Sequence, residues 1–422
     1  MQKRFGLLLP VVAAAIALLT LSGTQAAAQE PQTKYSVLYN FCSQPNCTDG
    51  RYPNAGVIRD EGGNLYGTTY QGGSTGYGVV FKLDPSRKET VLYNFCSQTN
   101  CTDGGESYAG VIRDEAGNLY GTTSYGGSHG YGVVFKLDPS GKETVLYNFC
   151  SQTNCTDGEI PYAGLIRDED GNLYGTTYFG GIAPIYDGYG VVFKLDPSGK
   201  ETVLHTFTGG ADGGNLYAGV IRDEAGNLYG TTPYGGSTGS GAVFKLDPSG
   251  KETVLYNFCS QTNCTDGSVP FAGVIRDAAG NLYGTTVLGG DRCSPAFPYG
   301  CGVVFKLDPS GKETVLYTFT GKHGAGPQGG LTLGDDGSLY GTTSNGGYRS
   351  ALDDPGRGVV FKVDPEGKET LLHAFNRTWE GGAPFGVLLM HNDSPSSTSL
   401  YGTANGGLGY GVIFKVMLTA TE

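Results

Sequence analysis

The chain has 422 residues, of which 40 are acidic and 28 basic, and a formal net charge of −12 at pH 7. Nucleic acid and anionic lipid bind Lys/Arg-rich surfaces, so this balance argues against both as partners. The 72 glycines and single tryptophan favour strands and turns over helices.

The first 28 residues predict a secretory signal. Lys3 and Arg4 precede a mostly apolar run, Leu7–Leu21, and three alanines ending at Ala28 suit cleavage. A membrane anchor is the alternative, but the run is short and a proline interrupts it. We expect cleavage near Ala28, no membrane span in the rest of the chain, and a secreted protein, either extracellular or periplasmic.

One phrase, Leu-Tyr-Gly-Thr-Thr, occurs six times, and a copy ending in alanine makes a seventh. The period lies between 54 residues, from Tyr66 to Tyr120, and 61 residues, from Tyr340 to Tyr401. A repeat of this length indicates one supersecondary unit copied in tandem.

Each unit is predicted to hold four short strands. In the second unit these are Gly110–Asp114, Leu119–Thr123, Val133–Leu137 and Glu143–Phe149, all rich in β-branched and aromatic residues. Tight turns join the first strand to the second and the third to the fourth, and a Gly-rich loop joins the second to the third. The turn aspartates are predicted to cap their own hairpins: Asp60, Asp114, Asp168, Asp223 and Asp277.

The two ends of the chain are complementary. A lone fourth strand, Ser36–Phe41, precedes the first complete unit, and the seventh unit ends at its third strand, Gly411–Lys415. This arrangement predicts an all-β fold, a seven-bladed β-propeller of four-stranded antiparallel blades whose last blade the N-terminal strand completes. A linear solenoid would not need an N-terminal strand that completes its last unit. The expected division is a signal peptide at 1–28, a short lead at 29–34, the propeller at 35–418 and a tail at 419–422.

Ten cysteines indicate an oxidising compartment. Eight form C-x4-C pairs in four equivalent loops and two share an insert, so local pairing is the economical expectation. Such small rings add only about 2 kcal/mol through chain entropy. Zinc is the alternative, but the spacing is not C-x2-C and no histidine accompanies the pairs. The expected disulfides are Cys42–Cys47, Cys96–Cys101, Cys150–Cys155, Cys259–Cys264 and Cys293–Cys301.

If the first strand of each unit is innermost, the cysteine loops and the Gly-Gly loops share one face, which is the candidate binding face. Aromatic residues collect there in two columns, and flat rings beside glycine loops suit stacking on sugars. The competing interpretation is that the rings wedge between blades. The column before the first strands is Asn54, Tyr108, Tyr162, Tyr217, Phe271, Gln328 and Pro384, and its four aromatic members are candidate ligand-binding residues. The column before the third strands adds the candidates Tyr77, Tyr131 and Tyr189.

An arginine column lies in the predicted innermost strands. We expect it to pair with carboxylates between blades, and the alternative is that it attracts an anion into the channel. Its members are Arg59, Arg113, Arg167, Arg222 and Arg276.

The five histidines fall at unrelated repeat positions, and no catalytic triad order or metal-ligand spacing emerges. We therefore assign no catalytic residue, metal or cofactor. An enzyme would have to draw on the divergent loops, with residues such as His323, Arg357 or Trp379.

The order Gly-Val-x-x-Asp-x-x-Gly-Asn-Leu-Tyr, followed by Val-Phe-x-Leu-Asp-x-x-Gly-Lys, resembles the repeat of NHL-type secreted β-propellers. The fuller signature, Gly-Asn-Leu-Tyr-Gly-Thr-Thr with Gly-Gly and Gly-Val-Val-Phe-Lys, is similar to the GloVer tandem repeat of bacterial exported proteins. The resemblance covers residues 35–416 and implies no established activity. Propellers of related pattern include binding scaffolds, lyases and lactonases.

We therefore expect an exported, monomeric, non-catalytic binding or scaffold propeller that recognises a polysaccharide or cell-surface glycan on the face of the cysteine and Gly-Gly loops. One alternative is a propeller-type hydrolase or lyase acting on an extracellular carbohydrate or lactone. The other is a structural surface or matrix protein.

Overall fold

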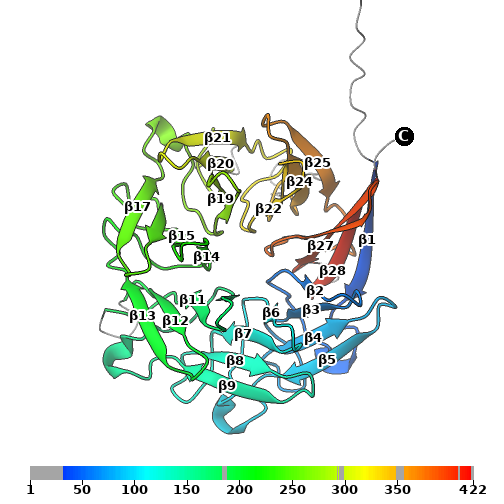
Figure 1. Cartoon of the computed structure of the whole chain (residues 1–422). Coiled ribbons are helices and arrows are strands. Elements are labelled where there is room, and N and C mark those ends of the chain that lie inside the picture. Colours follow the sequence, from blue (N-terminus) through cyan, green and yellow to red (C-terminus); the bar gives the residue numbers. More distant parts are fainter. Residues whose placement is uncertain are drawn as a thin grey trace, which may run out of the picture.

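The computed structural model describes residues 32–182, 188–291, 293, 299–347, 356–406 and 409–419. Across these residues, strands β1 to β28 form seven four-stranded antiparallel sheets, set around a ring as blades (Figure 1). The predicted seven-bladed all-β propeller is confirmed. The expected signal peptide lies outside the described residues. None of the helices found in the described part is long and apolar enough to cross a membrane.

The strands of each blade run from the channel outward in chain order, apart from the last blade. Blades 1 to 3 contain β2 (Ile58–Arg59), β3 (Leu65–Thr68), β4 (Val79–Leu83) and β5 (Glu89–Asn94); β6 (Ile112–Arg113), β7 (Leu119–Thr123), β8 (Val133–Leu137) and β9 (Glu143–Asn148); β10 (Ile166–Arg167), β11 (Leu173–Thr176), β12 (Val191–Leu195) and β13 (Glu201–Thr206). Blades 4 to 6 contain β14 (Ile221–Arg222), β15 (Leu228–Thr232), β16 (Ala242–Leu246) and β17 (Glu252–Asn257); β18 (Ile275–Arg276), β19 (Leu282–Thr286), β20 (Val303–Leu307) and β21 (Glu313–Thr318); β22 (Thr332–Leu333), β23 (Leu339–Thr343), β24 (Val359–Val363) and β25 (Glu369–Ala374). Blade 7 contains β26 (Leu389–Ser394), β27 (Ser397–Ala404), β28 (Val412–Thr419) and β1 (Gln32–Asn40). Short 3-10 helices lie in four cysteine loops: η1 (Pro45–Cys47), η2 (Thr99–Cys101), η3 (Thr153–Cys155) and η4 (Thr262–Cys264).

The N-terminal strand closes the ring. β1 pairs antiparallel with β28, from Gln32 opposite Thr419 to Asn40 opposite Val412. In Figure 1 the blue β1 accordingly lies beside the red β28. The predicted closure is confirmed, and it removes the open sheet edge that a seventh blade of three strands would expose.

The innermost strands are shorter than predicted. β6 contributes only two paired residues, Ile112 and Arg113, where the sequence suggested Gly110–Asp114. The blades converge toward the channel axis, and a Cβ on Gly110 would lie 3.0 Å from the carbonyl oxygen of Gly56 in the preceding blade. Crowding at the axis therefore leaves little room for a longer pleated strand.

Phenylalanines form the core between blades. Phe95, at the end of the outer strand of blade 1, meets Phe135 of blade 2 edge to face, with ring centroids 5.1 Å apart. The glycine of the repeated phrase makes room for this ring, because a Cβ on Gly121 would lie 2.6 Å from Phe135 Cζ. Phe135 is fully buried.

Threonine hydroxyls tie neighbouring blades together near the channel. Thr68 donates to the carbonyl of Ala109 at 2.7 Å. The same bond crosses the ring closure, where Thr403 donates to the carbonyl of Ala55 at 2.7 Å. The first and last units are thus joined in the same way as interior neighbours.

The turn aspartates cap their own hairpins as expected, and the arginines of the innermost strands lie close to them. Asp114 accepts hydrogen bonds from the backbone of Asn118 at 2.8 Å and from the hydroxyl of Tyr120 at 3.0 Å, which confirms the capping role. Burial acts to raise the pKa of Asp114, but hydrogen bonds from Asn118 and Tyr120 and the charge of Arg167 hold it below its usual value. Arg167 belongs to the next blade, and Arg276 of blade 5 lies 3.6 Å from the carboxylate of Glu224 in blade 4, so these two arginines act on carboxylates of a neighbouring blade, as expected for the column.

Candidate functional site

The long loops share one face, as predicted. The cysteine loop and the Gly-Gly loop of one unit form a bridge at Gly105 and Tyr125. The carbonyl of Cys101 also accepts a hydrogen bond from the backbone of Gly127 at 2.9 Å. Each pair of loops is therefore one structural unit on this face.

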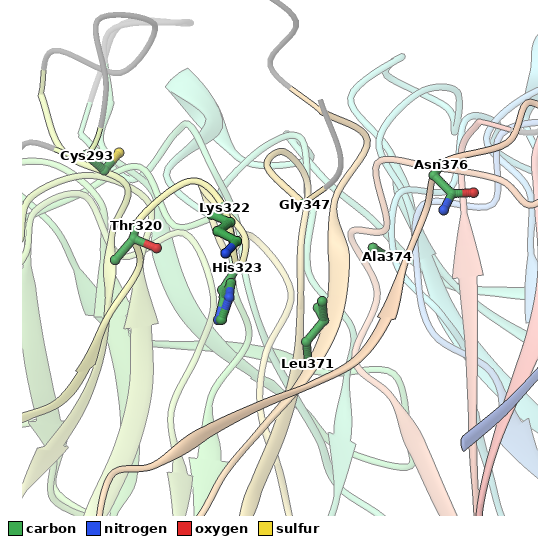
Figure 2. A pocket seen from close by; sticks show the side chains of 8 residues that line it. All are labelled: Cys293, Thr320, Lys322, His323, Gly347, Leu371, Ala374 and Asn376. Carbon is green, nitrogen blue, oxygen red and sulfur yellow. The ribbon is translucent and has the colours of Figure 1, made fainter. Parts of the chain in front are cut away.

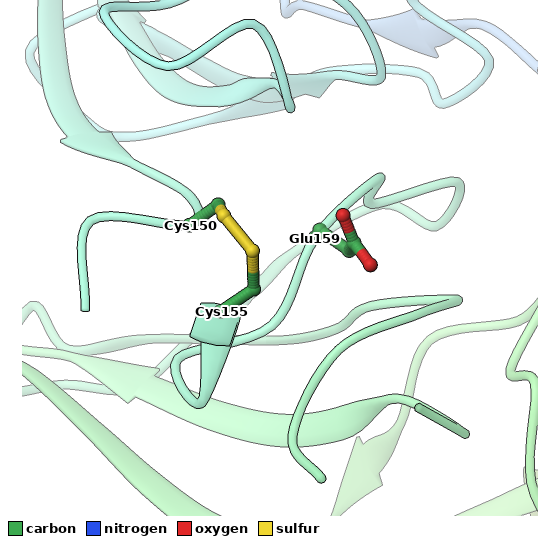
Figure 3. Close-up of side chains that lie close together, drawn as sticks. All are labelled: Cys150, Cys155 and Glu159. Carbon is green, nitrogen blue, oxygen red and sulfur yellow. A yellow bond between two sulfur atoms is a disulfide. The ribbon is translucent and has the colours of Figure 1, made fainter. Parts of the chain in front are cut away.

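All five predicted disulfides are present. Figure 3 shows Cys150–Cys155 beside the carboxylate of Glu159, and the three ligand-type groups lie within 4.8 Å of one another. The sulfurs are bonded to each other, whereas zinc binds the free thiolate. We therefore interpret this group as structural.

A cavity of about 380 Å³ opens at the channel mouth, and every blade contributes one lining residue. The sequence placed Pro384 in this ring, but the lining residue is its neighbour Phe385, so that assignment was wrong by one position. Pro384 packs instead on the preceding blade, where a Cβ added to Gly358 would lie 3.1 Å from its Cδ. The lining residues are Asn54, Tyr108, Tyr162, Tyr217, Phe271, Gln328 and Phe385.

Four of these residues form a continuous aromatic arc. The rings of Tyr108 and Tyr162 meet edge to face at 4.7 Å, and those of Tyr162 and Tyr217 stack at 5.4 Å with an interplanar angle of 7°. Tyr217 then meets Phe271 at 4.7 Å. Burial raises the pKa of Tyr162 to about 12, so its hydroxyl remains a hydrogen-bond donor at neutral pH.

Tyrosines behind the arc were missed by the sequence analysis. Tyr70 lies 4.5 Å from Tyr108, and Tyr178 lies 5.2 Å from Tyr162, in both cases between ring centroids. Both directly follow the phrase Leu-Tyr-Gly-Thr-Thr, so the residue after the phrase was the available signal.

Amides occupy the other side of the mouth. Asn54 accepts a hydrogen bond from the side chain of Asn405 at 2.6 Å. Gln328 donates to the hydroxyl of Ser344 at 3.2 Å. The Oδ1 atom of Asn405 is buried and accepts no hydrogen bond from the described residues. The cavity thus has a continuous aromatic arc on one side and, on the other, two amides that flank Phe385.

The second aromatic column does not line this cavity. The ring of Tyr77 stacks on Tyr125 at 5.5 Å, and its carbonyl accepts a bond from Glu106 in the next blade at 2.8 Å. The carbonyl of Tyr131 similarly accepts from Ile160 at 2.9 Å. Tyr189 lies against the following loop, where a Cβ on Gly214 would be 2.7 Å from its own Cβ. These positions match the alternative, wedges between blades.

Paired acids repeat around the outer edge. The buried carboxylate of Asp103 accepts hydrogen bonds from Tyr93 and from the backbone of Ser97, both at 2.8 Å. Burial, with the charge of Asp103, raises the pKa of Glu143 to about 7. The same pairing recurs as Asp49 with Glu89, Asp157 with Glu201, Asp212 with Glu252 and Asp266 with Glu313.

Three of the five histidines fit this outer pattern, and two of them share one repeat position, so the prediction that all five fall at unrelated positions was wrong. His205 and His373 replace the strand tyrosine, opposite Val192 and Val360. Burial lowers the pKa of His373 to about 4. His323 takes the place of the loop aspartate, directly before a glycine of positive φ.

The residues suggested for an enzyme do not converge. His323 bonds to Glu369 at 2.8 Å. Trp379, which is 45% exposed, has the guanidinium of Arg377 over its ring at 5.6 Å. The backbone carbonyl of Arg357 accepts a hydrogen bond from Ala383. None of the three suggested residues, His323, Arg357 or Trp379, lines the channel-mouth cavity.

Comparisons with known proteins identify the repeat. The family model described as the Gloeobacter/Verrucomicrobia repeat matches residues 22–183, 90–297 and 293–422, which confirms the resemblance drawn from the repeated signature. No curated protein matches the sequence.

Several solved structures align over most of the chain. A fungal alcohol oxidase in complex with copper aligns with a TM-score of 0.51 at 11% identity, covering 93% of this chain and 77% of that one. A putative gluconolactonase gives 0.40 at 11% identity, covering 92% of each chain, and a polysaccharide lyase gives 0.44 at 11%, covering 94% of each. The first similarity shows the fold alone, and the other two carry no argument about activity.

Proposed function

Because the chain belongs to the Gloeobacter/Verrucomicrobia repeat family and its repeats close into a propeller, we propose that it is a binding propeller that recognises carbohydrate at the channel mouth. The apolar C–H face of a sugar ring would stack on the aromatic arc. The sugar hydroxyls would bond to the amides opposite. A volume of about 380 Å³ falls within the range of small-molecule sites.

The uneven distribution of aromatic residues around the ring supports this proposal most strongly. Aromatic rings that served only to pack blades would be expected at this position in every unit. Instead the position is aromatic in blades 2 to 5, through Tyr108, Tyr162, Tyr217 and Phe271, and in blade 7, through Phe385, whereas it is an amide in blades 1 and 6. The continuous aromatic arc of blades 2 to 5 therefore faces a side on which two amides flank Phe385, and recognition of an asymmetric ligand requires such a difference in chemistry between the two sides.

Export is part of the same proposal. Five disulfides suit an oxidising compartment, and glycans are most accessible to a protein outside the cytoplasm. Cleavage near Ala28 remains a prediction from the sequence.

Glycan-array binding of the purified protein tests the function. A Tyr108→Ala and Tyr162→Ala double variant is expected to lose affinity roughly tenfold or more, because truncating central aromatic residues of a binding site costs over about 1 kcal/mol each. Tyr125→Ala is the matched control, since Tyr125 is 41% exposed on an outer loop and lines no part of the cavity.

Two results would count against this function. Binding that survives in the double variant would place the ligand elsewhere on the protein. A failure to bind any glycan tested would favour the alternative of a structural surface or matrix protein.

A further inference from the structure

A second cavity lies at the outer edge between blades 5 and 6. It has a volume of about 510 Å³ and separates two walls, shown in Figure 2. Thr320, Lys322 and His323, on the loop after β21, form one wall. Leu371, on β25, and Asn376, just beyond it, form the other. This groove is distinct from the channel mouth, with which it shares no lining residue.

The charge of this loop is reversed relative to its counterparts. At the position of His323, the other six units carry an acid: Asp49, Asp103, Asp157, Asp212, Asp266 and Glu380. The preceding residue is Lys322 here, and it is threonine, alanine or tryptophan in the other units. One blade of an acidic protein therefore presents two adjacent basic side chains.

The loop is also shorter, which exposes the groove. Three residues separate Phe319 from His323, whereas seven separate Phe95 from Asp103, because the cysteine segment is missing. Leu371 on the facing strand is 40% exposed. Apolar surface is thereby left open beside the basic pair.

The glutamate that begins the outer strand of each blade has a different partner in blade 6. Its equivalents face an aspartate, but Glu369, whose side chain is 3% exposed, meets Nδ1 of His323 at 2.8 Å. This contact fixes the ring and leaves Nε2 for a ligand. The His323 side chain is 40% exposed, so a ligand in the groove can reach it.

We propose that this groove binds a small organic carboxylate, with Lys322 and His323 on the carboxylate and Leu371 against the apolar part of the molecule. Charge-assisted hydrogen bonds from an ammonium and an imidazole are the strong kind. Thr320 and Asn376 add neutral hydrogen-bonding groups. The proposal is independent of carbohydrate binding at the channel mouth.

Hexanoate and its neutral isostere hexanamide are the probes, followed by NMR of the protein with isotope-labelled histidine. Hexanoate is expected to shift the His323 signals and to bind roughly tenfold or more tightly than hexanamide, because only the carboxylate gains charge-assisted bonds. Lys322→Met should lower hexanoate affinity roughly tenfold and leave hexanamide unchanged. Lys142→Met, on an exposed turn of the opposite face, is the matched control and should change neither.

A second variant distinguishes a loss of hexanoate binding from a failure of the loop to fold. His323→Asp restores the residue of five other units, so the loop should fold while hexanoate binding is lost. Equal affinity for hexanoate and hexanamide, no response of the His323 signals, or full binding in Lys322→Met would each overturn the proposal. Inorganic phosphate that competes as well as hexanoate would also overturn it, since phosphate has no apolar part. Tyr108→Ala should leave hexanoate binding intact, which separates this test from that of the channel mouth.

Discussion

At the scale of single residues, the outer acid pairs make stability depend on pH. Glu143 lies beside the buried carboxylate of Asp103, and its own Oε1 is buried without a hydrogen-bond partner among the described residues. Burial first, and then the charge of Asp103, raises the pKa of Glu143 from 4.5 to about 7. A group whose folded-state pKa is raised contributes stability below its unfolded pKa, and this is lost as pH rises through the folded value.

The free energy of unfolding is therefore expected to fall as the pH rises from 4.5 to about 7, the unfolded and folded pKa values of Glu143, and to level off above that range. The partly buried His205 and His373 act in the opposite direction, because their lowered pKa values add stability as the pH rises toward 6.5, so the comparison of Glu143→Gln with wild type is needed to isolate the glutamate. Glu143→Gln should raise the melting temperature on the alkaline side of this pKa and flatten the decline. Glu115→Gln, on an exposed turn, is the control. A Glu143→Gln variant no more stable than wild type under alkaline conditions would show that the acid pair is not strained.

At the scale of the element, the repeated phrase is explained by packing within the blade. Gly121 of β7 pairs with Phe135 of β8, and the phenylalanine ring occupies the space that a side chain at the glycine would need. The backbone conformation of Gly121 is ordinary, since it is absent from the residues with positive φ. Space, and not conformational freedom, selects glycine here.

Gly121→Ala should consequently destabilise the protein by about 1–3 kcal/mol, the usual cost of overpacking a core. Gly164→Ala is the matched control, because its Cβ would meet nothing closer than 4.0 Å. Denaturant unfolding monitored by circular dichroism compares the two. Equal midpoints for both variants would mean that the core yields to a methyl group and that the glycine serves another purpose.

Local elements were largely predictable, because turns and β-rich segments carry their own signals. The predicted Leu119–Thr123 and Val133–Leu137 coincide with β7 and β8. The convergence of the blades at the axis shortens β6. Because this convergence depends on neighbouring blades, the sequence of a single unit does not reveal it. The column of residues before the first strands was assigned wrongly at Pro384, which lies in the most divergent unit. Phe385 is the residue of that unit that aligns with the column.

The candidate site was predictable only in part. Repeat position alone placed Tyr108, Tyr162, Tyr217 and Phe271 together, since equivalent residues meet around a closed ring. Contacts between different positions of one unit could not be identified in this way. His323 and Glu369 are one such contact, formed between the loop that leads into blade 6 and the outer strand of that blade.

At the scale of the whole molecule, function depends on closure. Each of the seven blades supplies one residue of the channel-mouth cavity, so the cavity exists only while the ring is complete. The pairing of β1 with β28 joins the two ends of the described chain, and the threonine bond between Thr403 and Ala55 supports the same junction nearer the axis.

Cross-linking of the two end strands tests this closure most directly. Ser36 on β1 lies opposite Lys415 on β28, so a Ser36→Cys and Lys415→Cys double variant should form a disulfide within one chain, detected by mass spectrometry of its peptides. Ser36→Cys with Lys136→Cys, which places the second thiol in blade 2, is the control and should not link. A linked Ser36–Lys415 pair in a monomer is the predicted result. Free thiols at both positions, or links only between separate molecules, would contradict the closed ring and the site built on it.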